Sequence, residues 1–260
     1  MGSSSSVLLF EYSLLTCPLS EIEFNSKCII NTVNQYSFII AENDKEFKSA
    51  LKHADILLPD GVGIVAATKL LTGQNIKKIA GADLHDHLLN DLNKKKGRCF
   101  YLGSSVKTLN LIKRKIRLEF PDIVVETYSP PFKKFFLKHE NDTIINAINA
   151  FGPDVLFVGM TAPKQEKWIY NYGSQLSVNT ICSIGAVFDF YAGTIVRPSK
   201  FWRNLGLEWF IRLLKEPGRM YKRYLYYGPL FVFKILKSKV EKLRIKSILQ
   251  SPHDLELNKQ

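Results

Sequence analysis

The sequence predicts an α/β protein with a doubly wound, mostly parallel sheet and a basic helical appendage at its C-terminal end. Short apolar runs alternate with helical patterns as far as residue 196, which is typical of strand–helix–strand units. After that residue, helical patterns follow one another without an intervening strand. We therefore expect residues 1–196 to form one α/β domain, residues 197–248 to form the appendage, and residues 249–260 to form a disordered tail.

The predicted strands and helices alternate along the first domain. An N-terminal strand is expected near residues 7–15. Gly, Pro, Asp and Asn lie between the later apolar runs and end the strands. Apolar residues recur every three or four positions in the helical segments. The further expected strands are 28–33, 55–59, 98–103, 122–128, 154–159 and 179–185, and the expected helices are 44–54, 61–71, 82–95, 105–120, 141–151 and 163–173.

Two helical regions make up the appendage, and they hold most of the positive charge. The first, 205–216, is closed by Pro217, and the second, 218–246, is expected to break near Gly228-Pro229. The net charge of the chain is +12, and residues 197–246 contain 14 Lys or Arg but only three Asp or Glu.

Aromatic residues such as Trp202, Trp209, Tyr221 and Tyr224 are interleaved with these basic residues. Rings of this kind settle at lipid headgroups, so we expect the appendage to lie on an anionic membrane surface. A solvated basic face and a nucleic-acid surface are the alternatives.

Several classes of protein are disfavoured by what the sequence lacks. The four cysteines lie far apart, mostly in apolar settings, which predicts buried free thiols rather than disulfides or a zinc site. No apolar stretch approaches the ~20 residues that span a bilayer, and the N-terminal segment lacks the basic region of a signal peptide. We therefore expect a cytoplasmic protein.

A candidate catalytic carboxylate follows the apolar run 55–59. Asp60 lies between Pro59, which stops the strand, and Gly61, which frees the backbone. Ligands of parallel α/β sheets bind beyond the carboxyl ends of the strands, so Asp60 would face a cleft. Its alternative role is to cap the next helix.

Two neighbouring patterns point to ligands only weakly. Residues 61–66 match the G-x-G-x-x-A dinucleotide fingerprint, but the acidic residue that should end a second strand is Asp83, which opens a helix. That helix also carries His85, Asp86 and His87, of which only His87 shares a face with Asp83. Two possible ligands do not make a metal site, so we expect Asp83 to cap the helix.

A helix start with an unusual first turn follows the run 154–159. Pro163 suits the first helical position, and Gln165 could fold back as a capping side chain. The free amides and positive end of this helix would point at the cleft, where Lys164 adds a cation. Such a turn suits a diphosphate or a uracil edge. A capped helix with a solvated polar turn is the alternative.

Polar residues at further strand ends converge on the same rim of the sheet. Thr32 and Asn34 follow the strand 28–33, and Gly185 and Asp189 follow the strand 179–185. The carboxyl ends of parallel strands meet at one edge, so we expect these side chains to border one cleft.

Five separated segments of the chain resemble, in order and spacing, the WecG/TagA/CpsF family of glycosyltransferases. They are LLPDGVGIVAATKLL, IAGADLHDHLL, FYLGSS, PDVLFVGMTAPKQEKWI and SIGAVFDFYAGTIVRPSKFWRNLGLEWFIRLLKEPGRMYKRY. The resemblance runs from about Lys27 to Phe233 and implies a Rossmann-like core with a C-terminal appendage that docks on the bilayer. It also implies inverting transfer of a sugar from a UDP-sugar to an undecaprenyl-diphosphate-linked sugar at the inner face of the membrane.

The resemblance also assigns expected roles to residues of this chain. It implies that Asp60 is the catalytic base and that Thr32 and Asn34 position the acceptor or the base. It implies that Gln165 lines the donor pocket and that basic residues of the appendage grip the lipid diphosphate, namely Arg212, Arg219 and Arg223. The other substrate-binding candidates in these motifs are Gly81, Asp83, Gly103, Lys164 and Gly185.

The expected chemistry needs no metal, because the Asp-x-Asp with which many nucleotide-sugar enzymes hold a divalent ion is absent. Lys222 precedes Arg223, so the sequence leaves open which cation meets the phosphate. The donor sugar also stays open between N-acetylmannosamine and another hexose. The rival hypotheses are a non-catalytic membrane- or nucleic-acid-binding protein and a nicotinamide oxidoreductase.

Overall fold

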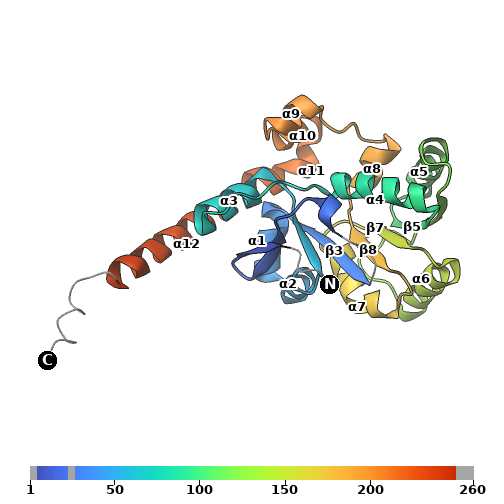
Figure 1. The fold of residues 1–260 in the computed structure, drawn as a ribbon, viewed down its shortest axis with the longest axis horizontal. Coiled ribbons are helices and arrows are strands. Elements are labelled where there is room, and N and C mark those ends of the chain that lie inside the picture. Colours follow the sequence, from blue (N-terminus) through green and yellow to red (C-terminus); the bar gives the residue numbers. More distant parts are fainter. Residues whose placement is uncertain (1–4, 23–26, 250–260) are drawn as a thin grey trace.

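An eight-stranded sheet runs through the computed structural model, which describes residues 5–22 and 27–249 (Figure 1). The strand order is β1-β2-β4-β3-β8-β7-β5-β6. Only β1 and β2 pair antiparallel, and every other neighbouring pair is parallel. The predicted doubly wound, mostly parallel sheet is therefore confirmed. The strands are β1 (Ser6–Leu9), β2 (Tyr12–Leu15), β3 (Cys28–Val33), β4 (Ile56–Pro59), β5 (Arg98–Gly103), β6 (Val124–Tyr128), β7 (Val155–Gly159) and β8 (Thr180–Ser183).

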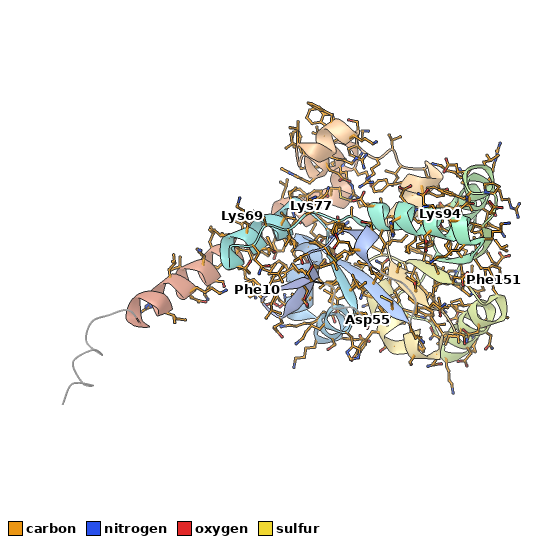
Figure 2. The ribbon with its side chains drawn as sticks, viewed as in Figure 1. Phe10, Asp55, Lys69, Lys77, Lys94 and Phe151 are labelled. Atoms are coloured by element: carbon orange, nitrogen blue, oxygen red, sulfur yellow. The ribbon has the colours of Figure 1, made fainter. Side chains whose placement is uncertain are left out.

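Helices cover both faces of the sheet, and alternate strand residues serve the two faces. Tyr101 and Phe157 pack in one buried cluster with α4 (Gly81–Lys95), α5 (Val106–Glu119) and α8 (Val187–Ala192). Their neighbours Phe100 and Leu156 pack in another with α6 (Lys138–Phe151) and α7 (Lys164–Tyr172). Side chains fill the space between the sheet and the helices on each face (Figure 2). The helices carry exposed lysines such as Lys69 on α3 and Lys94 on α4.

A third buried cluster lies at the β1–β2 end of the sheet. It joins these strands to α1 (Gln35–Asn43), α2 (Lys45–Lys52) and α3 (Val62–Thr72) through Phe38, Phe47 and Ile64. All four cysteines are buried and unpaired, which confirms the prediction of free thiols.

The predicted single N-terminal strand, 7–15, is wrong. Phe10 has a φ of 53°, in the left-handed region, and Phe10 and Glu11 form the turn between β1 and β2. A sharp reversal of this kind normally carries Gly or Asn, and neither is present here. The sequence therefore gave no local sign of a hairpin.

Helices alone make up the appendage, as predicted. They are α9 (Lys200–Asn204), α10 (Glu208–Lys215), α11 (Pro217–Tyr221), a π-helical segment (Lys222–Tyr226) and α12 (Tyr227–Leu249). The helical region runs through Gly228-Pro229 without a gap, and the break expected near them is a change of helix type, from the π-helical segment to α12 at Tyr227. The expected tail began at residue 249, but Leu249 ends α12, and residues 250–260 lie outside the described residues.

Part of α12 belongs to the core, although the helix extends away from the body of the protein (Figure 1). Phe231 and Ile235 are buried in the cluster with α1, and the Phe231 ring packs edge-on against Phe38 at 5.3 Å between centroids. The ammonium of Lys239 donates to the carbonyl of Leu70, near the end of α3, at 2.9 Å. Neither α12 nor any other helix in the described part of the chain has the length and apolar character needed to cross a bilayer.

The packing of α12 against α1 predicts unequal effects for two neighbouring phenylalanines. Phe231→Ala should lower the free energy of unfolding by about 3 kcal/mol, because it leaves a cavity in a buried aromatic cluster. Phe233→Ala, on the exposed side of the same helix, should change it by less than about 0.5 kcal/mol. Urea denaturation followed by circular dichroism measures both values. Equal losses of unfolding free energy in the two variants would mean that Phe231 is not packed in the hydrophobic core.

Candidate active site

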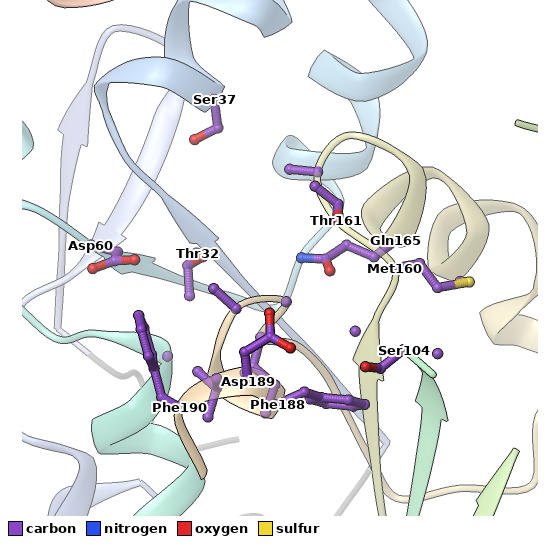
Figure 3. A pocket seen from close by; sticks show the side chains of 18 of the residues that line it. Thr32, Ser37, Asp60, Ser104, Met160, Thr161, Gln165, Phe188, Asp189 and Phe190 are labelled. Atoms are coloured by element: carbon purple, nitrogen blue, oxygen red, sulfur yellow. The ribbon is translucent and has the colours of Figure 1, made fainter. Parts of the chain in front are cut away.

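A cavity of about 1250 Å³ lies where the carboxyl ends of the central strands meet the appendage. The segments that follow β3, β4, β5, β7 and β8 line one side of it, and α10, α11 and the π-helical segment contribute the other. The structure thus brings together most of the residues singled out in the sequence. Figure 3 shows Asp60, Thr32, Gln165 and Asp189 around this common hollow.

Asp60 reaches the cavity directly from the end of β4. Its backbone amide donates to the carbonyl of Val33 at 2.9 Å, which holds it beside the neighbouring strand β3. The N-cap of α3 is Gly61 rather than Asp60, so capping does not explain the aspartate. No described residue forms an ion pair or hydrogen bond with its carboxylate.

The surroundings of Asp60 favour the protonated carboxyl group. Burial raises its pKa to about 6, and repulsion from the Glu208 carboxylate adds to this rise. Lys78, Arg197 and Arg212 oppose it through their positive charges. A carboxylate poised in this way is suited to accept a proton near neutral pH.

Two glycines of the G-x-G-x-x-A pattern, Gly61 and Gly63, leave space for the side chain of Gln35. A Cβ at Gly61 would lie 2.9 Å from Oε1 of Gln35, and one at Gly63 would lie 3.0 Å from its Nε2. The space that a dinucleotide would need above these glycines is thus filled by Gln35, and the fingerprint hypothesis has no support from the geometry.

Gln165 and Glu166 form a buried pair in the cavity wall. Gln165 Nε2 donates to Glu166 Oε1 at 2.9 Å, whereas Gln165 Oε1 and Glu166 Oε2 have no partner among the described residues. Burial raises the pKa of Glu166 to about 7, against the hydrogen bond from Gln165. The expected capping by Gln165 is wrong, because its amide turns to Glu166 and Pro163 occupies the N-cap of α7. A solvated polar turn does not describe this pair either.

Thr32, Asn34 and Lys164 line the cavity, and the last two also hold local structure. Asn34 caps α1, with its Oδ1 accepting from the amide of Ser37 at 3.1 Å. The Lys164 ammonium donates to the carbonyl of Lys133 at 2.6 Å, which ties the β6–α6 loop to α7.

The three candidate glycines also line the cavity. A Cβ at Gly103, where φ is 118°, would lie 2.4 Å from the carbonyl oxygen of Gly159, so β5 and β7 could not pass so closely there with a larger residue. A Cβ at Gly185 would lie 3.2 Å from Gln165 Oε1, and this glycine therefore leaves room for the amide. At Gly81 a Cβ would meet only ordinary contacts with Ile184 and Val187.

Asp83 is the one expected site residue that does not line the cavity. Its Oδ2 accepts from the amide of Ala80 at 2.9 Å, which confirms the expected cap of α4. His85 is buried and shares a hydrogen bond of 2.6 Å with the hydroxyl of Tyr101, and burial lowers its pKa to about 3. Within residues 5–22 and 27–249, no group of three or more His, Cys, Asp or Glu is arranged to hold a metal ion.

The appendage supplies three arginines to the cavity. Arg212 stacks on the ring of Phe190 at 5.2 Å, and its buried Nε and Nη2 have no hydrogen-bond partner in the described chain. Buried guanidinium donors without partners are costly, and an anion bound in the cavity would satisfy them. Arg219 lies 3.9 Å from Asp189, and Arg223 stacks on Tyr36. Arg223 lines the cavity, whereas Lys222 is exposed outside it.

The cavity is also lined by six charged residues that the sequence did not assign to it, namely Lys78, Lys133, Lys134, Glu166, Arg197 and Glu208. Glu208 pairs with Lys78 at 3.3 Å and lies 3.6 Å from Arg197. Glu166 was recognised only as part of the first turn of α7. Single charged residues in helices and loops carry no distinctive spacing, so no sequence pattern could have found them.

The family model described as the glycosyl transferase WecG/TagA/CpsF family matches residues 13–245. A Bacillus subtilis (strain 168) protein is 31% identical over 214 residues, which cover 82% of this chain and 81% of that protein. A Bacillus spizizenii protein is 30% identical, with 76% and 75% covered, and a Staphylococcus aureus (strain MW2) protein is 27% identical, with 81% and 80% covered. Each is named N-acetylglucosaminyldiphosphoundecaprenol N-acetyl-beta-D-mannosaminyltransferase.

The chain belongs to the WecG/TagA/CpsF family. The protein is therefore an enzyme, a glycosyltransferase. The match includes every strand end that borders the cavity and the appendage helices through most of α12.

The raised pKa of Asp60 predicts that this carboxylate destabilises the fold at neutral and higher pH. Its pKa is higher in the folded protein than in the unfolded chain, so its ionisation opposes folding increasingly as the pH rises to about 6. Asp60→Asn should therefore raise the free energy of unfolding by about 2–3 kcal/mol at pH 8 and by much less at pH 4. Urea titrations at the two pH values measure this difference. A variant no more stable than the parent at pH 8 would show that Asp60 is well solvated.

Proposed function

We propose that the enzyme transfers a hexose, N-acetylmannosamine or another, from a UDP-sugar to an undecaprenyl-diphosphate-linked sugar with inversion at the anomeric carbon. The observation that carries this proposal is the unpaired, half-buried Asp60 carboxylate in a cavity that also holds unsatisfied arginine donors. The named relatives, which act on a diphosphoundecaprenol-linked sugar, support the acceptor class and the choice of N-acetylmannosamine.

In the proposed reaction Asp60 acts as the general base. Its carboxylate takes the proton of the acceptor hydroxyl while that oxygen attacks the anomeric carbon of the donor. The bond between the anomeric carbon and the diphosphate oxygen breaks at the same time, and UDP leaves with the electron pair. One displacement from the opposite side inverts the anomeric configuration. Thr32, in the same part of the cavity, would position the acceptor hydroxyl or the base.

Two diphosphates require positive charge in this mechanism. The arginines of the appendage would grip the diphosphate of the lipid-linked acceptor, with Arg223 rather than Lys222 in the cavity. The N-terminal turn of α7, with Lys164 and Gln165, would receive the donor, whose departing UDP is stabilised by helix amides and cations. We propose that these groups replace a divalent ion, in keeping with the absence of an Asp-x-Asp motif.

The proposed acceptor is anchored in a bilayer, so the enzyme must reach the membrane surface. The appendage carries most of the net positive charge, and α12 exposes apolar side chains such as Phe233, Leu236 and Val240. Basic helices with exposed apolar residues bind anionic lipid surfaces. We therefore propose a peripheral enzyme at the cytoplasmic face of the membrane, with the cavity beneath the docked appendage.

Replacing the proposed base tests the function directly. With a short-chain lipid-diphosphate sugar as acceptor and EDTA present, the enzyme should release UDP from UDP-N-acetylmannosamine or another UDP-hexose. Asp60→Asn should lower kcat by about 10²- to 10⁴-fold, because the amide cannot take the hydroxyl proton. The matched control is Asp122→Asn, an exposed aspartate in the turn after α5. Ordinary turnover by Asp60→Asn would rule out Asp60 as the base.

The unsatisfied donors of Arg212 predict a specific effect on the acceptor. Arg212→Gln should raise the KM for the lipid-diphosphate acceptor about tenfold or more, because charge-assisted hydrogen bonds to the diphosphate are lost. The KM for the UDP-sugar should change little. Lys215→Gln, an exposed cation on the same helix, provides the comparison. A selective rise in the donor KM would instead place UDP against Arg212.

A further inference from the structure

Glu208 of the appendage forms ion pairs with two of the three cations whose charges act on the proposed base. Its carboxylate pairs with Lys78, which precedes α4, at 3.3 Å, and with Arg197, which precedes α9, at 3.6 Å. All three side chains are largely buried, with 18–24% exposed, so solvent screens these ion pairs only partly. The Glu208 carboxylate thus joins α10 to the catalytic domain at the cavity wall.

The same two cations are potential partners of Asp60. Asp60, Lys78, Arg197 and Glu208 all line the cavity. The ion pairs of the described chain join Lys78 to Glu208, and Arg197 both to Glu208 and to Asp83 at 3.9 Å, and they leave Asp60 unpaired. A lysine or arginine next to Asp60 would stabilise its ionised form and make it a weaker base. Which carboxylate holds the cations therefore decides how strong a base Asp60 is.

We infer that Glu208 is a positioning residue that pairs Lys78 and Arg197 with the appendage and so prevents either cation from forming a salt bridge with Asp60. Docking of α10 then closes the cavity and also brings Glu208 to the cations, so that the Asp60 carboxylate stays unpaired and can accept a proton. This inference rests on the proposed role of Asp60 and extends it to a residue outside the reacting groups.

The charged groups that face Asp60 agree with this role. From α10 come Glu208 and Arg212, from the loops come Lys78 and Arg197, and from the π-helical segment comes Tyr224. Glu208 raises the pKa of Asp60, and the three cations lower it. Loss of Glu208 removes the repulsion, frees Lys78 and leaves Arg197 with Asp83 as its remaining carboxylate partner. The lost repulsion and the freed lysine both lower the pKa of Asp60, so the two consequences act in the same direction.

Breaking the Lys78–Glu208 pair from either side distinguishes positioning from mere anchoring. Glu208→Gln should lower the pKa of Asp60 by about one unit, and Lys78→Met should raise it. If the pair only anchored the appendage, both variants would loosen α10 and expose Asp60, and both would shift its pKa downward. The measurement is the carboxyl ¹³C shift of aspartate-labelled full-length protein against pH, with the Asp60 signal identified by its loss in Asp60→Asn.

Glu216→Gln is the matched control, because Glu216 is also a carboxylate of the appendage but pairs with Arg219. It should leave the Asp60 titration unchanged. Opposite shifts for Glu208→Gln and Lys78→Met support the inference, and shifts of the same sign, or no shift in Glu208→Gln, overturn it.

The pH dependence of kcat/KM separates this inference from the proposed function. If Asp60 is the base, the acid limb should move to lower pH in Glu208→Gln and to higher pH in Lys78→Met, in step with the ¹³C titration. Opposite titration shifts without a matching change in the rate profile would leave Glu208 as the residue that positions the cations and would refute Asp60 as the base.

Discussion

The desolvation of one carboxylate at the end of β4 is the constraint on which the site depends. Asp60 is held by the backbone hydrogen bond to Val33, and it has no side-chain partner within the described chain. It is half-buried where the appendage covers the carboxyl edge of the sheet, and this burial raises its pKa. Without that cover, a carboxylate following a strand would ionise at its ordinary pKa. The base strength proposed for Asp60 is therefore a property of two segments separated by well over a hundred residues.

The arrangement of charge follows from the same cover. Most of the excess positive charge lies on the appendage, yet several of its arginines turn inward to the cavity rather than outward to solvent. Arg212 keeps buried donors without partners, which is costly unless an anion occupies the cavity for part of the catalytic cycle. The proposed binding of two diphosphates would give the enzyme a physical reason to retain such groups, which a purely structural role does not.

The helix α12 packs the appendage against the hydrophobic core. Phe231 and Ile235 are buried against α1, whereas Phe233, Leu236 and Val240 are exposed. Lys239 donates to a backbone carbonyl near the end of α3, where a cation interacts favourably with the helix dipole. The buried side of α12 fixes the position of the appendage, and its exposed side remains available to the proposed lipid surface.

The sequence by itself determined the layers of the fold, because strands and helices differ in apolar period and both periods are local. It also located Asp60, Thr32 and Gln165, since parallel strands bring their carboxyl ends to one edge. Local sequence patterns gave wrong predictions where contacts with distant residues set the local conformation. The hairpin turn at Phe10 lacks turn residues, and Gln165 turns to Glu166 instead of capping α7. Only the tertiary structure decided that Arg223 rather than Lys222 faces the cavity and that Glu208 holds Lys78 and Arg197. Ion pairs between distant segments depend on how helices pack, and packing leaves no fixed spacing in the chain.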